Sequence, residues 1–176
     1  MANVVIVVDT LRGFLEADYP LYCGPVARSV IAPIHRLLER ERAAGSAIIY
    51  VADRHAPDDK EFQVFPPHCI AGTPESEVVP DLAPHPGDVV IGKTRYSGFF
   101  GTHLAQKLRE LCPDKVIVVG VCTDICVMHT VADARSRDYP VEVPVDCVAS
   151  FDPEAHKWAL QHMERVLGAT VNWDRQ

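Results

Sequence analysis

The sequence contains short runs in which every residue is apolar and most are β-branched. Val4–Val8 and Val116–Val119 are two such runs, and neither alternates with polar residues as a half-exposed strand would. Continuous runs of this kind are typical of parallel strands that are buried on both faces. Further β-like runs occur at Ala47–Val51, Val89–Ile91, Val141–Val145 and, more weakly, Ala169–Val171. The sequence therefore predicts a central parallel sheet of about six strands.

Segments with helical spacing separate these runs. Residues 25–44 carry one apolar stripe, formed by Val26, Val30, Ile34, Leu37 and Leu38. Gly45 is typical of a helix end, and the pair Asp152-Pro153 is typical of a helix start. We expect helices at Pro25–Ala44, Thr102–Leu111, Val127–Arg135 and Pro153–Leu167. Alternating strands and helices predict a three-layer α/β/α architecture with right-handed crossovers.

The length of 176 residues suits one domain with a sizeable core, so we expect a single domain over residues 1–176. The stretch from about residue 53 to residue 88 differs from the rest, because it is rich in Pro, Asp and Glu and has no clear period. Long irregular stretches in compact domains are usually functional. We therefore interpret residues 53–88 as an insert that contributes to a binding site.

Composition excludes several classes of partner. The formal net charge is −7 and no long basic run occurs, which argues against binding to nucleic acid or to an anionic membrane. No apolar stretch is long enough to span a bilayer, and Val4–Val8 is too short for a signal-peptide core. We expect a cytoplasmic protein whose six cysteines are free thiols. The alternative, a disulfide framework, would have fifteen possible pairings. No glycine-rich nucleotide-binding motif occurs.

Three reactive side chains fall where predicted strands end. Asp9 follows the first run, Lys93 follows the third, and Cys126 begins the helix after the fourth. In an open parallel sheet these ends meet at one edge. Taken singly, the three residues have commoner roles, as a turn residue, a surface lysine and a buried filler. Together they predict a nucleophilic site.

The expected chemistry of this site follows from the three residue types. A helix N-terminus and the Lys93 ammonium would lower the pKa of the Cys126 thiol. The thiolate would attack a carbonyl carbon, while Asp9 takes the thiol proton and passes it to the leaving group. Backbone N–H groups of the turn at residues 120–126 would stabilise the oxyanion.

A second cluster of polar residues lies at the start of the insert. Asp53 and His55 are two residues apart at a strand end, so their side chains point the same way, and Glu61 and His68 follow. Two imidazoles with one or two carboxylates suit Zn²⁺, Mn²⁺ or Fe²⁺. An isolated Asp-x-His pair is more often accidental, so this metal prediction depends on the cysteine edge lying nearby.

Aromatic residues gather in the same loops, and they would either complete an ordinary core or clamp a flat ring. These residues are Phe14, Phe65, Tyr96, Phe99 and Phe100.

In the same order along the chain, five motifs resemble those of the isochorismatase-like cysteine hydrolases, and in particular those of the bacterial nicotinamidases. The resemblance extends over essentially the whole chain. It implies the isochorismatase-like hydrolase fold and, within pyridine-nucleotide salvage, deamidation of nicotinamide to nicotinic acid and ammonia through a thioester. The matching motifs are Val-Val-Asp9, Asp53-x-His55, Phe65-Pro-Pro-His68, Lys93-Thr-Arg-Tyr96-Ser-Gly-Phe99 and Gly120-Val-Cys-Thr-Asp-Ile-Cys126.

The resemblance also implies roles for single residues. Cys126 is similar to the family's nucleophile, Asp9 to its general acid/base and Lys93 to their electrostatic partner. One divalent ion, zinc first and iron or manganese as alternatives, would bind the pyridine nitrogen and orient the ring. Its implied ligands are Asp53, His55, His68 and Glu61.

The implied substrate pocket is formed by other residues of the same motifs. Phe14, Phe65 and Tyr96 match positions that sandwich the ring, with Val121 beside them. The amides of Cys122 and Cys126 match the oxyanion hole, and the peptide bond between residues 121 and 122 matches a cis bond.

Three positions depart from the common pattern of these relatives. Leu11, Gly13 and Phe65 stand where many members have Gln, Asp and Trp, respectively. We expect the substrate range to extend to related heteroaromatic amides, such as pyrazinamide-like analogues. We further expect a homo-oligomer that acts on a small molecule.

Two other functional hypotheses stay open at this point. One is a sibling hydrolase that acts on another small amide or on an enol ether such as isochorismate. The other is a catalytically silent domain that serves as an assembly or regulatory partner.

Overall fold

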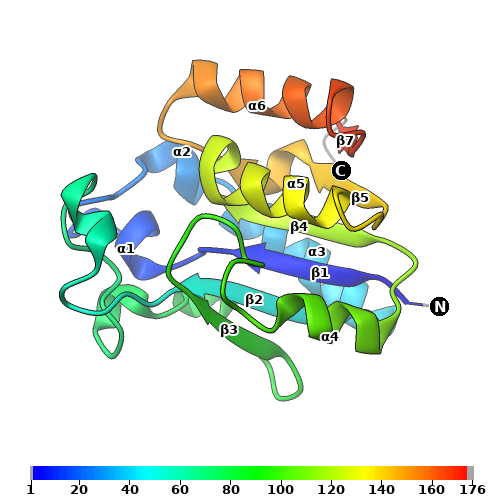
Figure 1. Ribbon diagram of the computed structural model, residues 1–176, viewed down its shortest axis with the longest axis horizontal. Coiled ribbons are helices and arrows are strands. Elements are labelled where there is room, and N and C mark those ends of the chain that lie inside the picture. The colour runs from blue at the N-terminus through cyan, green and yellow to red at the C-terminus, as the bar shows by residue number, and fades with distance from the viewer. Residues whose placement is uncertain (1, 174–176) are drawn as a thin grey trace.

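The computed structural model describes residues 2–173, and a parallel sheet lies at its centre (Figure 1). Six strands follow the order β3-β2-β1-β4-β5-β7, and a seventh, β6, pairs with β4. The predicted parallel sheet is confirmed; the short β6 was not predicted, because two residues give no readable pattern. The strands are β1 Val4–Val8, β2 Ala47–Asp53, β3 Val89–Lys93, β4 Val116–Val121, β5 Val141–Pro144, β6 Val148–Ala149 and β7 Thr170–Asn172.

Helices cover both faces of this sheet, which confirms the predicted three layers (Figure 1). Alternate residues of β1 divide between two apolar cores: Val5 and Val7 face α2 and α3, whereas Ile6 faces α4, α5 and α6. The helices are α1 Arg12–Leu15, α2 Pro25–Arg28, α3 Ile31–Ala43, α4 Leu104–Leu111, α5 Met128–Arg135 and α6 Pro153–Arg165. Residue 1 and residues 174–176 of the predicted domain lie outside the described residues.

The predicted helix over residues 25–44 is two helices, and the prediction of one was wrong. The Ser29 hydroxyl donates to the Val26 carbonyl over 2.6 Å, and the Val30 amide donates to Ala27 three residues back. These bonds replace the regular helical ladder at that point. As a result Val26 is 68% exposed, whereas the other four residues of the predicted stripe are buried.

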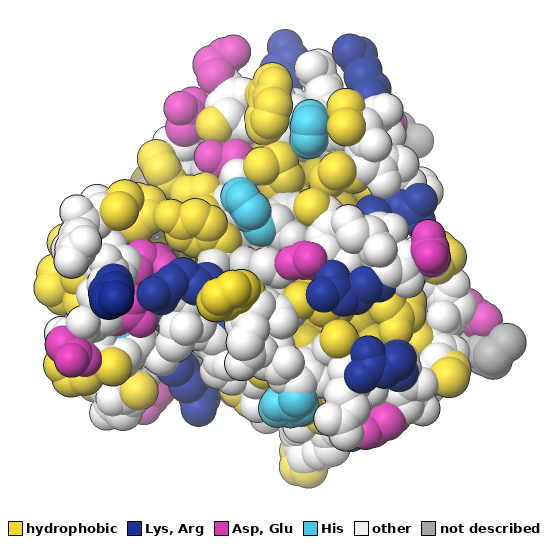
Figure 2. Space-filling model, in the orientation of Figure 1, with side chains coloured by type: hydrophobic (Ala, Val, Ile, Leu, Met, Phe, Trp, Pro, Cys, Tyr) yellow, Lys and Arg dark blue, Asp and Glu magenta, His cyan; other side chains and the backbone are white. Residues whose placement is uncertain are grey.

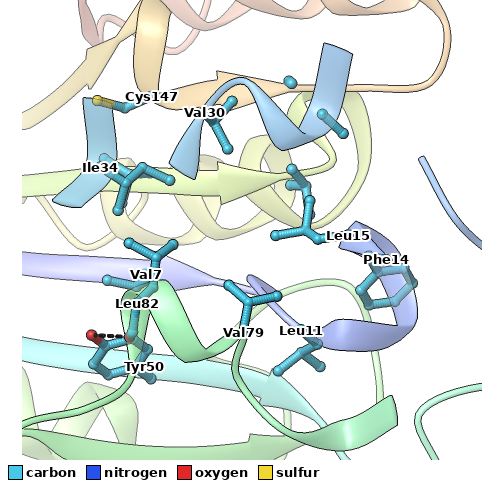
Figure 3. Packing of buried hydrophobic residues seen from close by; sticks show 14 of the residues in the cluster. Val7, Leu11, Phe14, Leu15, Val30, Ile34, Tyr50, Val79, Leu82 and Cys147 are labelled. Atoms are coloured by element: carbon cyan, nitrogen blue, oxygen red, sulfur yellow. Dashed lines mark hydrogen bonds between the residues drawn. The ribbon is translucent and has the colours of Figure 1, made fainter. Parts of the chain in front are cut away.

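The residues between β2 and β3 form irregular chain with three short 3₁₀ turns, η1 Lys60–Gln63, η2 Pro74–Ser76 and η3 Pro80–Leu82. With α1, the first part of this segment, including η1 and η2, lies at the carboxyl ends of the strands, on the left in Figure 1, and the chain then returns to the start of β3. The hydroxyl of Tyr50 in β2 donates to the Leu82 carbonyl over 2.9 Å and ties this segment to the sheet (Figure 3). Val79 packs nearby in the apolar core that contains Val7 and Tyr50 (Figure 3).

The structure describes all six cysteines and the distribution of surface charge. None of the six cysteines, all of which lie in the described part of the chain, forms a disulfide. On the face shown in Figure 2, Lys and Arg side chains are interspersed with Asp and Glu, and no basic surface dominates. Within residues 2–173, no helix has the length and apolarity that crossing a membrane requires.

Candidate active site

Three strands bring the predicted catalytic side chains to one point. Asp9 follows β1, Lys93 ends β3, and Cys126 lies on η4 (Thr123–Val127), a single π-helical turn between β4 and α5. Nζ of Lys93 lies 2.7 Å from Oδ2 of Asp9 and 3.4 Å from Sγ of Cys126. All three residues are buried, and at 8% Cys126 is the most exposed of them. The structure thus unites residues that are 117 positions apart at the extremes.

The backbone around Asp9 fixes the direction of its carboxylate. Asp9 has φ 49°, a left-handed conformation that Asp tolerates better than most residues. Its amide donates to the Val51 carbonyl over 3.0 Å, and its Oδ1 accepts from the amide of Asp53 over 2.9 Å. With one oxygen held in this way, the other faces the ammonium and the thiol.

A glycine allows β4 to pass close to β1 just before the turn that carries the thiol. Gly120 has φ 119°, and a Cβ at this position would lie 2.0 Å from the Val8 carbonyl oxygen. Only glycine fits here, for reasons of both conformation and space. The Val121–Cys122 peptide bond that follows is cis, as the resemblance implied. Residues 122 and 126, expected to form the oxyanion hole, lie at opposite ends of the same tight turn.

One expectation about Cys126 was wrong. Burial raises the pKa of its thiol well above the ordinary value; the Lys93 ammonium opposes this shift, and the carboxylates of Asp9 and Asp53 add to it. The sequence predicted a lowered pKa because it shows the helix and the lysine but not the depth of burial. An oxygen of Asp9, which could accept the thiol proton, lies within 4.8 Å of Sγ.

The pKa values of the neighbouring groups follow from the same burial and charges. Burial and the nearby Asp53 raise the pKa of Asp9 to about 6, against the pull of Lys93. Burial opposes the charge on Lys93, but its acidic neighbours, Asp9 first, hold its pKa well above the ordinary value. Burial likewise opposes the charge on Asp53, whose pKa Lys93 and two imidazoles keep far below the ordinary value.

The predicted metal ligands also come together, beside the thiol. Atoms of Asp53, His55 and His68 that can bind a metal lie within 4.8 Å of one another. Oδ2 of Asp53 is 3.5 Å from Nε2 of His55 and 3.8 Å from Nε2 of His68. Oε1 of Glu61 is 3.9 Å from the latter nitrogen. These separations are too long for hydrogen bonds.

The donor atoms of this cluster fit a divalent ion. Nε2 of His55 and Oε2 of Glu61 are buried without a hydrogen-bond partner among residues 2–173. The other ring nitrogens are engaged: Nδ1 of His55 is 3.0 Å from Asp59, and Nδ1 of His68 is 2.8 Å from the Pro66 carbonyl. Each imidazole thus presents Nε2 to the cluster, as metal-binding histidines do.

The charges of the cluster favour the same conclusion. Burial and the neighbouring Asp53 raise the pKa of Glu61, a sign of negative charge without full compensation. Burial opposes protonation of His55, but the nearby carboxylates of Asp53 and Asp59 raise its pKa to about 9. A divalent cation would compensate these carboxylates, and two imidazoles with two carboxylates suit zinc, iron or manganese.

A cavity of about 240 Å³ joins the thiol to this cluster. Its lining includes all four predicted substrate-contacting residues, Phe14, Phe65, Tyr96 and Val121. It includes further apolar or aromatic residues that the sequence did not predict, among them Leu21, Tyr22, Ile125 and Phe151. Among the described residues that line the cavity there is no Lys and no Arg.

Two of the predicted aromatic residues, and two of the three positions that differ from the common family pattern, do not line this cavity. Phe99 is buried in the core, with Arg137 over its ring at 4.6 Å, and Phe100 is 63% exposed. Leu11 and Gly13 are absent from the lining, and a Cβ on Gly13 would lie 2.8 Å from Sγ of Cys69. Of the three departures from the common pattern, therefore, only Phe65 can act directly on substrate choice.

Comparison with known proteins agrees with this geometry. A model of the isochorismatase domain matches residues 3–175. An isochorismatase family protein of Bacillus subtilis (strain 168) named PncA is 36% identical over 97% of this chain and 99% of its own. The ureidoacrylate amidohydrolase RutB of Agrobacterium fabrum (strain C58 / ATCC 33970) is 29% identical over 97% of this chain and 87% of its own.

Solved structures give the same result. Nicotinamidase PncA from Bacillus subtilis superposes with a TM-score of 0.93 at 36% identity, covering 98% of this chain and 99% of that one. N-carbamoylsarcosine amidase from Thermoplasma acidophilum superposes with a TM-score of 0.89 at 38% identity, covering 98% of this chain and 96% of that one. Pyrazinamidase of Pyrococcus horikoshii in complex with zinc superposes with a TM-score of 0.90 at 30% identity, covering 97% of this chain and 98% of that one. A family match over nearly the whole length, and the shared fold of these relatives, show that the chain belongs to the isochorismatase family of hydrolases.

Proposed function

We propose that this protein is a nicotinamidase, a metal-assisted cysteine hydrolase that converts nicotinamide to nicotinic acid and ammonia. The cavity is the observation that carries this proposal. It joins the buried thiol to a metal-type cluster and has aromatic side chains along its walls. An aromatic amide has two recognisable ends, a carboxamide for the thiol and a ring nitrogen for the cluster. Relatives that are nicotinamidases and pyrazinamidases support the same choice.

In the first half of the reaction, the Cys126 thiol forms a bond to the amide carbon. Asp9, held by the backbone amide of Asp53 and by Lys93, accepts the thiol proton as Sγ attacks. The amides of residues 122 and 126 stabilise the negative oxygen of the tetrahedral intermediate. Asp9 then gives its proton to the departing nitrogen, the C–N bond breaks, and ammonia leaves behind a thioester.

The second half reverses these roles. Asp9 takes a proton from water, and the water oxygen attacks the thioester carbon. The C–S bond breaks, and the proton returns to Sγ of Cys126. Lys93 keeps its charge throughout and compensates Asp9 or the thiolate, whichever is negative at each stage.

The metal ligands proposed for this enzyme are Asp53, His55, Glu61 and His68. A divalent ion bound there would supply a Lewis acid for the ring nitrogen of the substrate. Zinc is our first choice, and a zinc complex of a relative supports it. Phe14, Phe65 and Tyr96 would hold the ring between apolar surfaces.

The charges that line the cavity favour this substrate over those of two relatives. Ureidoacrylate and N-carbamoylsarcosine each carry a carboxylate, which needs a cationic partner when it is buried. The described lining offers no Lys or Arg, but it contains the carboxylates of Asp9, Asp53 and Glu61. A neutral ring avoids this repulsion.

An ammonia-release assay tests the proposal. The zinc-loaded protein is given nicotinamide, pyrazinamide, ureidoacrylate, N-carbamoylsarcosine and acetamide in parallel. We expect kcat/KM for nicotinamide to exceed the values for the two anionic amides by at least about 100-fold, the range that buried polar mismatches produce. Cys126→Ala should abolish release. A higher kcat/KM for either anionic amide, or no turnover of any amide, would contradict the proposal.

Two wider expectations remain predictions. We propose that the protein forms a homo-oligomer, supported by large apolar side chains at the surface such as Phe100 and Trp158. Light scattering after size-exclusion chromatography measures this directly. The expected cytoplasmic location is tested by fractionation of the source cells.

A further inference from the structure

A single carboxylate outside the family motifs holds two of the proposed metal ligands. Oδ2 of Asp59 lies 3.0 Å from Nδ1 of His55. Its other oxygen, Oδ1, accepts a hydrogen bond of 2.9 Å from the backbone amide of Glu61. One side chain therefore fixes the ring of the first ligand and the backbone of the second.

The local fold explains how Asp59 can do both. Asp59 is the N-cap of η1, and Glu61 lies in the first turn of that short helix. His55 lies four residues earlier, on a short parallel bridge to Ile70. The Asp59 side chain is 8% exposed, and Arg95 donates a 2.9 Å hydrogen bond to its Oδ1 from the solvent side.

The contact with His55 has a chemical consequence for that ring. When Nδ1–H donates to a carboxylate, the lone pair stays on Nε2, which is the atom that faces Asp53. His68 reaches the same state differently, because its Nδ1 lies 2.8 Å from the backbone carbonyl of Pro66. A carboxylate partner makes Nε2 of the imidazole a stronger electron-pair donor to a metal ion than a carbonyl partner does.

We propose that Asp59 is a positioning residue that raises the affinity of the cluster for a divalent ion. It orients His55 and holds Glu61 at the cluster without binding the ion itself. This inference rests on the proposed function, because it takes Asp53, His55, Glu61 and His68 to be a metal site.

The experiment measures zinc affinity in the absence of any substrate. Metal-free protein is titrated with zinc ions in competition with a chromogenic chelator. We expect Asp59→Ala to weaken zinc binding by about 10- to 100-fold, the usual effect of removing a ligand's outer partner. The exposed neighbour Asp58 provides the matched control, and Asp58→Ala should bind zinc as the parent does.

A second variant separates the two contacts. Asp59→Ser keeps one oxygen for the Glu61 amide, and serine is a good N-cap, but it has no second oxygen for His55. In the zinc-loaded parent, the proton on Nδ1 of His55 should give a resolved NMR signal because its hydrogen bond slows exchange. That signal should disappear in both the Ala and the Ser variants, whereas the corresponding His68 signal should remain.

The outcomes are distinguishable. Parent-like zinc affinity in a folded Asp59→Ala protein would overturn the role of Asp59 and leave the metal site standing. If the alanine variant does not fold, the serine variant decides. Parent-like zinc affinity and an intact His55 signal in Asp59→Ser would likewise overturn the role of Asp59. If the parent itself binds no zinc, both this inference and the metal part of the proposed function are wrong.

Discussion

Nζ of Lys93 lies 2.5 Å from Oδ1 of Asp53, the carboxylate whose other oxygen faces the two imidazoles. The same ammonium contacts Asp9 and Cys126. One buried cation is therefore shared by the proposed reaction machinery and by the proposed metal cluster. Removing its charge should affect both, and the contribution to each can be measured separately.

Lys93→Ala should slow the chemical step far more than it weakens substrate binding. Without the ammonium, nothing compensates the thiolate against Asp9 and Asp53, so the pKa of Cys126 should rise further. The pH profile of Cys126 alkylation by iodoacetamide should shift to higher pH. Lys107→Ala, which removes a surface lysine paired with Glu110, is the control. An identical alkylation profile in the Lys93 variant would count against the proposed role.

Asp9→Asn should lower kcat by about 10²- to 10⁴-fold, the contribution that a positioned general base commonly makes. The amide keeps the shape of the side chain but cannot accept the thiol proton. Rapid-quench measurement of the first turnover checks this, because thioester formation itself should be slowed. Asp58→Asn serves as the control at an exposed carboxylate. A first turnover within about tenfold of the parent would exclude Asp9 as the base.

His68→Ala should remove most of the bound metal. The parent should carry one divalent ion per chain, and loss of one imidazole leaves an incomplete ligand set. Elemental analysis after dialysis measures the ratio of metal to protein. His85 lies exposed in the same irregular segment, so His85→Ala should keep the parent ratio. Equal metal content in both variants would show that the ion binds elsewhere.

Tyr50→Phe should change how stability depends on pH. Burial raises the pKa of Tyr50 from 10.0 to about 12, so the unfolded chain releases this proton first as pH rises. The stabilisation is complete below pH 10 and is lost between pH 10 and about 12. It amounts to about 3 kcal/mol at most, by the conversion of two pKa units.

Urea unfolding across this pH range tests the Tyr50 prediction. At neutral pH the parent should be more stable by about 0.5–1.5 kcal/mol, because the phenylalanine loses the hydrogen bond to Leu82. That difference should shrink and then change sign as pH rises from 10 to 12, because only the parent loses up to about 3 kcal/mol over this range. Parallel stability curves for the two proteins would contradict the prediction.

Gly120→Ala should be far more damaging than Gly87→Ala. Both glycines have positive φ, 119° and 102°, so both substitutions strain the backbone by about 1 kcal/mol or more. Only at Gly120 does the new Cβ collide with backbone, whereas at Gly87 nothing lies within 4 Å. The difference in unfolding free energy between the two variants isolates the collision, and equal values would refute it.

The sheet and the main site were predictable because their signals are local. A run such as Val4–Val8 has no polar residue on either face, and this alone predicts burial on both sides. A reactive residue that follows such a run must then lie at the carboxyl edge, as Asp9 and Lys93 do. The alternation of strands and helices along the sequence predicts parallel strands, and parallel strands bring these ends together.

What the sequence did not predict depends on contacts between distant segments. The raised pKa of Cys126 follows from its burial among two carboxylates of other strands. Tyr22 and Phe151 line the cavity from loops without any period, and Asp59 acquires its partners only through the fold of η1. The break after α2 depends on one serine hydroxyl that competes with the helical ladder.

The irregular segment between β2 and β3 carries Glu61, Phe65 and His68 on one continuous piece of chain. Its contacts with the rest of the chain include the Tyr50–Leu82 hydrogen bond and the antiparallel bridge of Leu11 with Val78. A transplant of residues 54–88 into a related scaffold would move the proposed metal ligands Glu61 and His68 together with the proposed ring contact Phe65. Exchange of this segment would change those side chains and leave Cys126, which lies on η4, in place.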